Sequence, residues 1–258
     1  MNRPLLLHYH LFKNAGTSVE ATLERNFGPN WVSFDSPTPA GSVFASDVER
    51  LLVEHPDMCA LSSHQLKPPL PDIAGVDIVP IVFVRHPLDR IQSIYDFDRR
   101  RGPVTPAAEL AAANDLAGYV RIMLDRDSTL TCNFQVRALS DAWDPVTGLR
   151  TNRDDGHSLV RAKSFVSELP AVGVVEHFEG SWRRITAAIR SLFPSFDPTS
   201  DHTNADPSRA SDIDTRLERL RQRMGHELYD ELAGVNAMDF ELYRFALDRH
   251  MSPTEGVR

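Results

Sequence analysis

The sequence is poor in lysine and cysteine. Of its 28 basic residues only Lys13, Lys67 and Lys163 are lysines, and the rest are arginines, whose forked guanidinium groups suit phosphate and sulfate. The two cysteines, Cys59 and Cys132, lie far apart and outside any C-x-x-C pattern. The cysteines therefore give no sign of a zinc or redox site.

Two further absences narrow the class of protein. A net charge of −8 argues against a general nucleic-acid binder, which usually presents a basic face. No stretch reaches the ~18 apolar residues that a membrane span needs, and the first apolar run, 4–9, is too short for a signal peptide. We therefore expect a soluble, cytoplasmic protein with no transmembrane segment and no nucleic acid as partner. Its oligomeric state stays open.

Apolar runs alternate with helical periodicity along the chain, which is typical of an α/β fold. The runs expected to form strands are 5–9, 58–62, 78–84 and 171–175. Helices are expected from Thr17 and at 46–54, 87–101, 106–113, 116–125, 130–139, 158–169, 182–193, 213–232 and 238–249. Loops are expected at 28–41, 141–156 and 194–212. We predict one three-layer domain over 1–250 with a central parallel sheet, and a frayed tail at 251–258.

The segment that follows the first predicted strand has the features of an anion-binding loop. It leads into a helix, whose N-terminal amides and dipole attract anions, and it lies at a strand's carboxyl end. Gly16 permits close backbone approach, Thr17 and Ser18 add hydroxyls and one of them is expected to cap the helix, and Lys13 adds a positive charge. The residues predicted to bind the anion are Lys13, Asn14, Ala15, Gly16, Thr17 and Ser18.

This loop is not a Walker A motif. Lys13 precedes the only glycine of the loop, whereas G-x-x-x-x-G-K-[ST] places its lysine after the second glycine. A standard ATP or GTP hydrolase is therefore not expected. The alternative is an ordinary turn between a strand and a helix, with a surface lysine.

A second anion site is predicted after the strand 78–84. Arg85 follows this strand directly, and Ser93 comes eight residues later in the next helix. A guanidinium and a hydroxyl that converge there would bind one phosphate. The alternative is that Arg85 pairs with Asp89 while Ser93 fills the helix interior. If both sites exist, a ligand with two separated anionic groups would bridge them.

These segments resemble the motifs of PAPS-dependent sulfotransferases, closest to the Golgi carbohydrate branch. Residues 10–18, HLFKNAGTS, resemble the family loop H-x-P-K-T-G-G-T-S, with Phe12 in place of Pro and Asn14-Ala15 in place of Thr-Gly. Residues 82–93, VFVRHPLDRIQS, resemble the family's strand, R-[DHN]-P and following Ser. Weaker likenesses cover 133–137, 172–178 and 239–245.

The resemblance implies a P-loop NTPase-like sulfotransferase fold that uses 3′-phosphoadenosine-5′-phosphosulfate (PAPS) and releases the bisphosphate PAP, with no metal required. Loop 13–18 would bind the 5′-phosphosulfate, and Arg85 and Ser93 the 3′-phosphate. The acceptor would be a small molecule or a saccharide that reacts through a hydroxyl or an amine. The loop 194–212 and the proline-rich segment 66–71 are expected to shape its site.

Two residues are predicted to carry the chemistry. Lys13 would offset charge on the leaving oxygen, and His64 would be the general base. His64 follows the strand 58–62 and matches the family's catalytic histidine, while His10 is the alternative. His8 and His10 share one strand face, but no third ligand has suitable spacing, so no metal site is predicted.

Other assignments stay open. Glu176 and His177 end the last predicted strand, where they either orient the acceptor or serve the structure. For the whole chain, one alternative is a P-loop-like nucleotide or small-molecule kinase, which would need Mg²⁺ ligands. Another is a non-catalytic nucleotide-binding protein.

Overall fold

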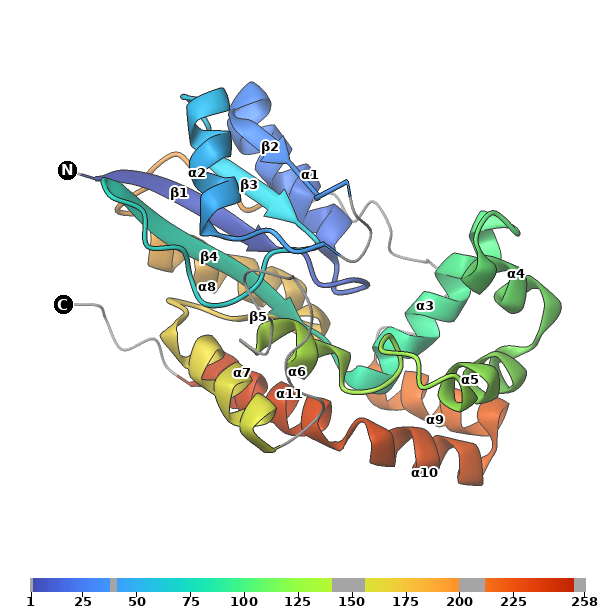
Figure 1. Ribbon diagram of the computed structural model, residues 1–258. Coiled ribbons are helices and arrows are strands. Elements are labelled where there is room, and N and C mark those ends of the chain that lie inside the picture. The colour runs from blue at the N-terminus through green and yellow to red at the C-terminus, as the bar shows by residue number, and fades with distance from the viewer. Residues whose placement is uncertain (1, 38–40, 141–155, 200–211, 253–258) are drawn as a thin grey trace.

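The computed structural model describes residues 2–37, 41–140, 156–199 and 212–252. Among them, five parallel strands form one sheet in the order β2-β3-β1-β4-β5 (Figure 1). The strands are β1 (Arg3–Tyr9), β2 (Trp31–Ser33), β3 (Ala60–Ser63), β4 (Val76–Val84) and β5 (Gly173–Val174). The predicted parallel sheet is therefore confirmed.

Helices cover both faces of the sheet, which gives three layers. Leu6 of β1 packs with residues of α1 (Gly16–Phe27) and α8 (Phe178–Ile189). Its neighbours Leu5 and Leu7 face the other layer. That layer contains α2 (Ala45–Glu54), α6 (Phe134–Leu139), α7 (Gly156–Glu168) and α11 (Ala237–Met251). Because both faces are covered, β1 is a continuous apolar run without alternation.

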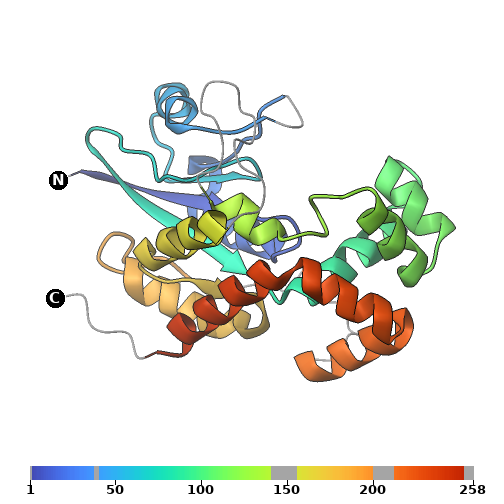
Figure 2. The ribbon, with the colours of Figure 1, turned by 60° about the horizontal axis from the view of Figure 1, so that its bottom comes forward.

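A helical lobe with its own apolar cluster lies beyond the carboxyl end of β4 (Figures 1 and 2). Its helices are α3 (Pro87–Arg101), α4 (Pro106–Ala113), α5 (Leu116–Asp125), α9 (Ile213–Met224) and α10 (His226–Val235). Since β4 leads directly into α3, the lobe extends the edge of the sheet where the predicted anion sites lie. None of the helices in the described residues has the length and apolar character that a membrane span needs.

Three predicted elements were wrong in detail. The helix expected at 213–232 is two helices, because Gly225 ends α9 with a φ of 81°. The loop expected at 28–41 contains β2, which is too short to show a periodic pattern. The helix expected at 130–139 begins only at Phe134, because Asn133 is left-handed with a φ of 45°.

The sheet also accommodates Pro80, which has no amide hydrogen to donate. Pro80 pairs with Leu7 of β1, whereas β5 pairs with β4 only at Phe83 and Val84. At Pro80 the strand therefore has β1 as its neighbour and is locally an edge, where proline is tolerated. Of the predicted loops, 141–155 and 200–211 lie outside the described residues, as does the tail from 253 onward.

Candidate active site at the carboxyl edge of the sheet

The predicted anion loop leaves β1 and turns into α1 through two left-handed residues, Lys13 (φ 65°) and Ala15 (φ 61°). Helix α1 begins at Gly16 and has no side-chain cap, so the prediction that Thr17 or Ser18 caps it was wrong. Because no N-cap side chain is hydrogen-bonded to the first turn, the amides and the positive end of the helix dipole can face the pocket, which Gly16, Thr17 and Ser18 line.

His10 holds this turn in shape. A Cβ atom on Gly16 would lie 1.8 Å from His10 Nε2, so only glycine fits beside the ring. The other ring nitrogen, Nδ1, lies 3.0 Å from Glu20 Oε1. The His10 ring thus contacts α1 at both Gly16 and Glu20, as expected for a residue that shapes the loop.

Arg85 connects the second predicted site to the first. Strands β1 and β4 are neighbours, with Tyr9 opposite Val82, so their carboxyl ends lie side by side. The Arg85 guanidinium donates from Nη1 to the Lys13 carbonyl oxygen at 2.7 Å. Its Nε and Nη2 lie 2.9 and 2.8 Å from Asp89 Oδ2. The pairing with Asp89 that we held open therefore exists, together with a contact to the loop.

One pocket of about 1000 Å³ joins the two sites. It is lined by five of the six predicted loop residues, by Arg85 and Ser93, and by His64. Asn14 does not line it. The Asn14 side chain is buried and donates to the Phe83 carbonyl and to Gln135 Oε1, both at 2.8 Å. Asn14 therefore fastens the loop to β4, and its predicted part in nucleotide binding stays a prediction.

Gln135, within the resembling segment 133–137, has a role behind this site that the sequence did not reveal. Its Oε1 accepts from Asn14 Nδ2 and from the Arg85 backbone N–H, and its Nε2 donates to the Arg85 carbonyl at 2.8 Å. Its own backbone N–H donates to the buried Asp239 of α11. The side-chain amide of Gln135 thus connects the loop after β1 with the start of the loop after β4. This contact is the structural role of the segment 133–137.

Arg216 is a second such residue. It arrives from α9, and its Nε donates to Asp89 Oδ1 at 2.9 Å. The Asp89 carboxylate therefore holds two guanidinium groups, Arg85 and Arg216, and all three side chains line the pocket. The trio carries one net positive charge, which favours an anion in front of it.

Lys13 and Phe12 pack on an aromatic ring of the helical lobe. Lys13 Nζ lies 4.1 Å from the ring centroid of Phe97, and Phe12 meets the same ring edge-on at 6.0 Å. The aromatic contact gives the phenylalanine at position 12 a packing partner in α3. It also supports the lysine at the pocket wall by a cation–π interaction.

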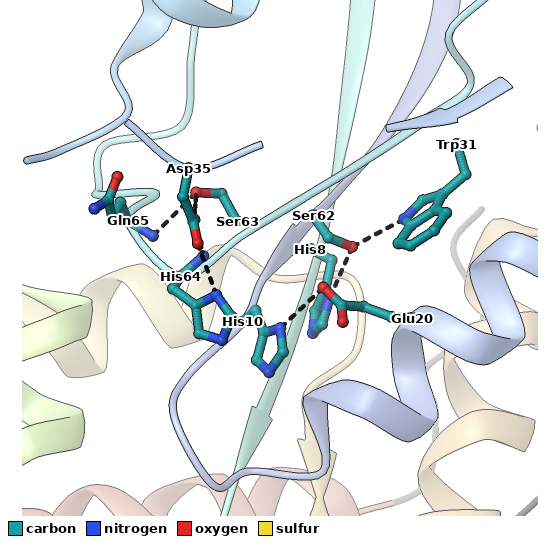
Figure 3. A network of polar contacts seen from close by, with 9 residues as sticks. All are labelled: His8, His10, Glu20, Trp31, Asp35, Ser62, Ser63, His64 and Gln65. Carbon is teal, nitrogen blue, oxygen red and sulfur yellow. Dashed lines mark hydrogen bonds and ion pairs between the residues drawn. The ribbon is translucent and has the colours of Figure 1, made fainter. Parts of the chain in front are cut away.

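His64 directly follows β3 (Figure 3) and is one of the residues that line the pocket. Its Nδ1 is 3.0 Å from Asp35 Oδ2, and its ring stacks on His10 at 3.8 Å. Burial and the neighbouring His10 lower the pKa of His64, while Asp35 opposes this shift. A neutral imidazole at pH 7 is the form that a general base requires.

Glu176 and His177 also line the pocket. Glu176 Oε1 accepts from the His86 backbone N–H at 3.0 Å, and burial raises the pKa of Glu176. The ring of His177 stacks on that of His250 at 5.5 Å. Each residue thus has a structural partner as well as access to the pocket.

The structure supplies the third group that the histidine pair lacked in the sequence. His8, His10 and Glu20 each offer a ligand atom within 4.8 Å of the others. Within this group His10 Nδ1 contacts Glu20 Oε1 at 3.0 Å, and His8 Nδ1 lies 3.1 Å from Ser62 Oγ. Ser62 Oγ also accepts from the indole of Trp31.

The fold and the pocket define an α/β protein with a pocket, lined by charged, histidine and apolar side chains, at the carboxyl ends of the strands of a parallel sheet. No family model matches the chain. An uncharacterized protein of Archaeoglobus fulgidus is 30% identical over 256 residues, which cover 97% of this chain and 98% of that protein. The chain belongs to the same family as this archaeal protein.

Proposed function

We propose that the chain is a PAPS-dependent sulfotransferase with a P-loop-like fold. The observation that carries the proposal is the contact between Arg85 and Lys13 inside one pocket. PAP carries phosphates on the 3′ and 5′ positions of one ribose, so it needs two anion sites a short distance apart. Two such sites at neighbouring strand ends meet this requirement, and the pocket has the size of a small-molecule site.

In this assignment, the loop 13–18 and the start of α1 bind the 5′-phosphosulfate. Arg85 and Ser93 bind the 3′-phosphate, and Arg216 adds a second guanidinium beside Asp89. Lys13 lines the same pocket as Arg85 and Ser93, and we assign its ammonium group to the 5′-phosphosulfate.

The reaction is an in-line transfer. The acceptor oxygen or nitrogen attacks sulfur, the bond from sulfur to the bridging phosphate oxygen breaks, and PAP leaves with the electron pair on that oxygen. Lys13 offsets the negative charge that grows there, and His64 takes the acceptor's proton. Catalysis of this kind depends on positioning and charge, as in phosphoryl transfer.

The acceptor would enter from the side of the pocket where His64 lies. By resemblance to the carbohydrate branch we propose a saccharide or other small molecule, and we propose that the enzyme acts in the cytoplasm. Fold analogy alone does not name the substrate.

Calorimetry with PAP and with AMP, which lacks the 3′-phosphate, tests the nucleotide assignment. We expect PAP to bind at least about tenfold more tightly than AMP, because a charge-assisted contact contributes roughly 1.5–3 kcal/mol. Equal affinities would contradict a 3′-phosphate site at Arg85.

Sulfate transfer from ³⁵S-labelled PAPS to a panel of hydroxyl and amine acceptors tests the activity. We expect transfer without Mg²⁺ and its loss in Lys13→Ala and His64→Ala, with the exposed-pair variant Lys163→Ala as control. If neither substitution slows transfer, the assigned roles are wrong. PAP binding without transfer to any acceptor would favour a non-catalytic nucleotide-binding protein, and Mg²⁺-dependent phosphate transfer from ATP would favour a kinase.

A further inference from the structure

We propose that Asp35 is a positioning residue for His64. Its carboxylate fixes the imidazole in the tautomer that carries hydrogen on Nδ1, which leaves the lone pair of Nε2 to accept the acceptor's proton. The catalytic part of this inference rests on the proposed function, whereas the tautomer rests on the geometry of the two side chains.

The Asp35 carboxylate accepts hydrogen bonds on both oxygens (Figure 3). Oδ1 accepts from the His64 backbone N–H at 2.9 Å and from Ser63 Oγ at 2.8 Å. Oδ2 lies 3.0 Å from His64 Nδ1. Because an ionised carboxylate has no hydrogen to give, the hydrogen of this last bond belongs to Nδ1.

Asp35 is ionised at neutral pH. Partial burial opposes its charge, but the hydrogen bonds from Ser63 and His64 together hold its pKa below the ordinary value. The tautomer of His64 is therefore set by a fixed negative charge, in the way that the aspartate of a serine-protease triad sets its histidine.

The plane of the His64 ring is held in place as well as its Nδ1 atom. The ring stacks on His10 at 3.8 Å with the planes 27° apart, and His10 is held by Glu20. Among the described residues, the Nδ1 contact with Asp35 is the one side-chain hydrogen bond of His64. Its side chain is 45% exposed and lines the pocket, so Nε2 has room for a substrate atom.

Strand register brings Asp35 to this place. Strands β2 and β3 run parallel with Ser33 opposite Ser62, so the residues that follow each strand lie side by side. The Phe34 N–H donates to the Ser62 carbonyl and extends the pairing by one step. Gln65 then braces the turn, because its backbone N–H donates to Ser63 Oγ and its Oε1 accepts from the Ser36 N–H.

The substitution Asp35→Asn tests the tautomer because the two carboxylate oxygens have unequal partners. Oδ1 meets two donors and Oδ2 meets one, so the asparagine carbonyl is favoured at the Oδ1 position. Its NH₂ group then faces Nδ1 and turns that nitrogen into an acceptor. The hydrogen moves to Nε2, and His64 loses the lone pair with which it would take a proton.

The experiment combines NMR with kinetics on the full chain. Long-range ¹⁵N–¹H correlation spectra of the imidazoles, assigned with His64→Ala, report which nitrogen of His64 carries hydrogen. Sulfate transfer from ³⁵S-PAPS to the best acceptor of the panel gives kcat and KM, and calorimetry gives PAP affinity. Asp57→Asn, an exposed neighbour before β3, is the matched control.

We expect hydrogen on Nδ1 in the native chain and on Nε2 in Asp35→Asn. We also expect kcat to fall by about 10- to 100-fold, within the usual contribution of a general base, while KM for PAPS and PAP affinity change less than about twofold. Asp57→Asn should match the native chain.

Two results would overturn the inference while leaving sulfuryl transfer in place. One is an active native enzyme whose His64 carries hydrogen on Nε2. The other is a tautomer change in Asp35→Asn with no loss of kcat. If the native chain transfers no sulfate although the tautomers are as expected, the proposed function fails, the catalytic role of Asp35 falls with it, and its control of the ring remains.

Discussion

The guanidinium of Arg85 donates a hydrogen bond to the carbonyl oxygen of Lys13 at 2.7 Å, across neighbouring strands. The other two guanidinium nitrogens of Arg85 contact Asp89 of helix α3, and the residue is 5% exposed. One side of the guanidinium group therefore contacts the first loop and the other side contacts α3. Arg85 therefore organises both halves of the pocket before any ligand arrives. Its role in structure and the binding role that we propose for it rest on the same guanidinium group.

The substitution Arg85→Lys tests the geometry of the Arg85 guanidinium group while keeping its positive charge. Lysine keeps the positive charge but cannot reach the Lys13 carbonyl and Asp89 in a fork. We expect PAP affinity, measured by calorimetry, to fall by at least about tenfold, which corresponds to the loss of one charge-assisted hydrogen bond. Arg50→Lys, in an exposed pair with Glu54 on α2, is the control and should bind PAP as the native chain does. Unchanged affinity in Arg85→Lys would contradict the assignment of Arg85 to the 3′-phosphate.

The substitution Arg216→Ala tests a residue that the sequence did not point to. We expect weaker PAP binding, by about 3- to 30-fold, because one of the two guanidinium groups on Asp89 is removed and the local charge becomes less positive. Since screening weakens such attraction, the difference from the native chain should shrink at high salt. Arg219→Ala, exposed on the same helix, is the comparison. A salt-independent loss, or an equal loss in both variants, would speak against an electrostatic role.

Local signals explain why several elements could be predicted with their bounds. Pro87 and Pro106 stand at the first positions of α3 and α4, where proline suits a helix. The side chains of Thr105 and Asp115 cap α4 and α5 by accepting from backbone amides one turn on. Each of these features depends on residues that are close together in the chain, so the sequence displays it directly.

The residues that were missed depend on long-range packing. Asp35 contacts His64, 29 positions away, only because β2 pairs with β3, and β2 gave no periodic signal. Arg216 contacts Asp89 across 127 positions because α9 packs against α3 in the helical lobe, and no local pattern encodes that packing. Gln135 was noticed only as part of a resembling segment, and its role follows from two loops meeting around it.

The substitution Gly16→Ala should damage both the fold and the site. The new methyl group would overlap His10 Nε2, and the ring cannot retreat because it is held by Glu20 and stacked on His64. We expect a loss of roughly 1–3 kcal/mol of stability in urea unfolding, and loss of PAP binding. Gly234→Ala, in α10 with open space around it, should instead stabilise by up to about 1 kcal/mol. Equal stability of the two variants would contradict the close packing of His10 on Gly16.

The ring of His86 gives the fold a predictable pH dependence. It is buried edge-on against Phe240 and Tyr243, and its Nδ1 has no hydrogen-bond partner in the described part of the chain. Burial lowers the pKa of His86 from its ordinary value of 6.5 to about 4. The folded state therefore binds a proton less readily than the unfolded state, and the contribution of the neutral ring to stability is complete above pH 6.5.

This contribution should be lost progressively as the pH falls from 6.5 to 4, by up to about 3 kcal/mol, since one pKa unit corresponds to about 1.4 kcal/mol. Urea unfolding at a series of pH values measures it as the difference between the native chain and His86→Asn, which does not titrate. Other buried groups titrate in both proteins, so their effects cancel in the difference. His226→Asn, exposed at the start of α10, should follow the native curve. A difference in unfolding free energy between His86→Asn and the native chain that stays constant across this range would show that His86 is not buried as a neutral ring. The packing of the end of β4 against α11 would then differ from that described.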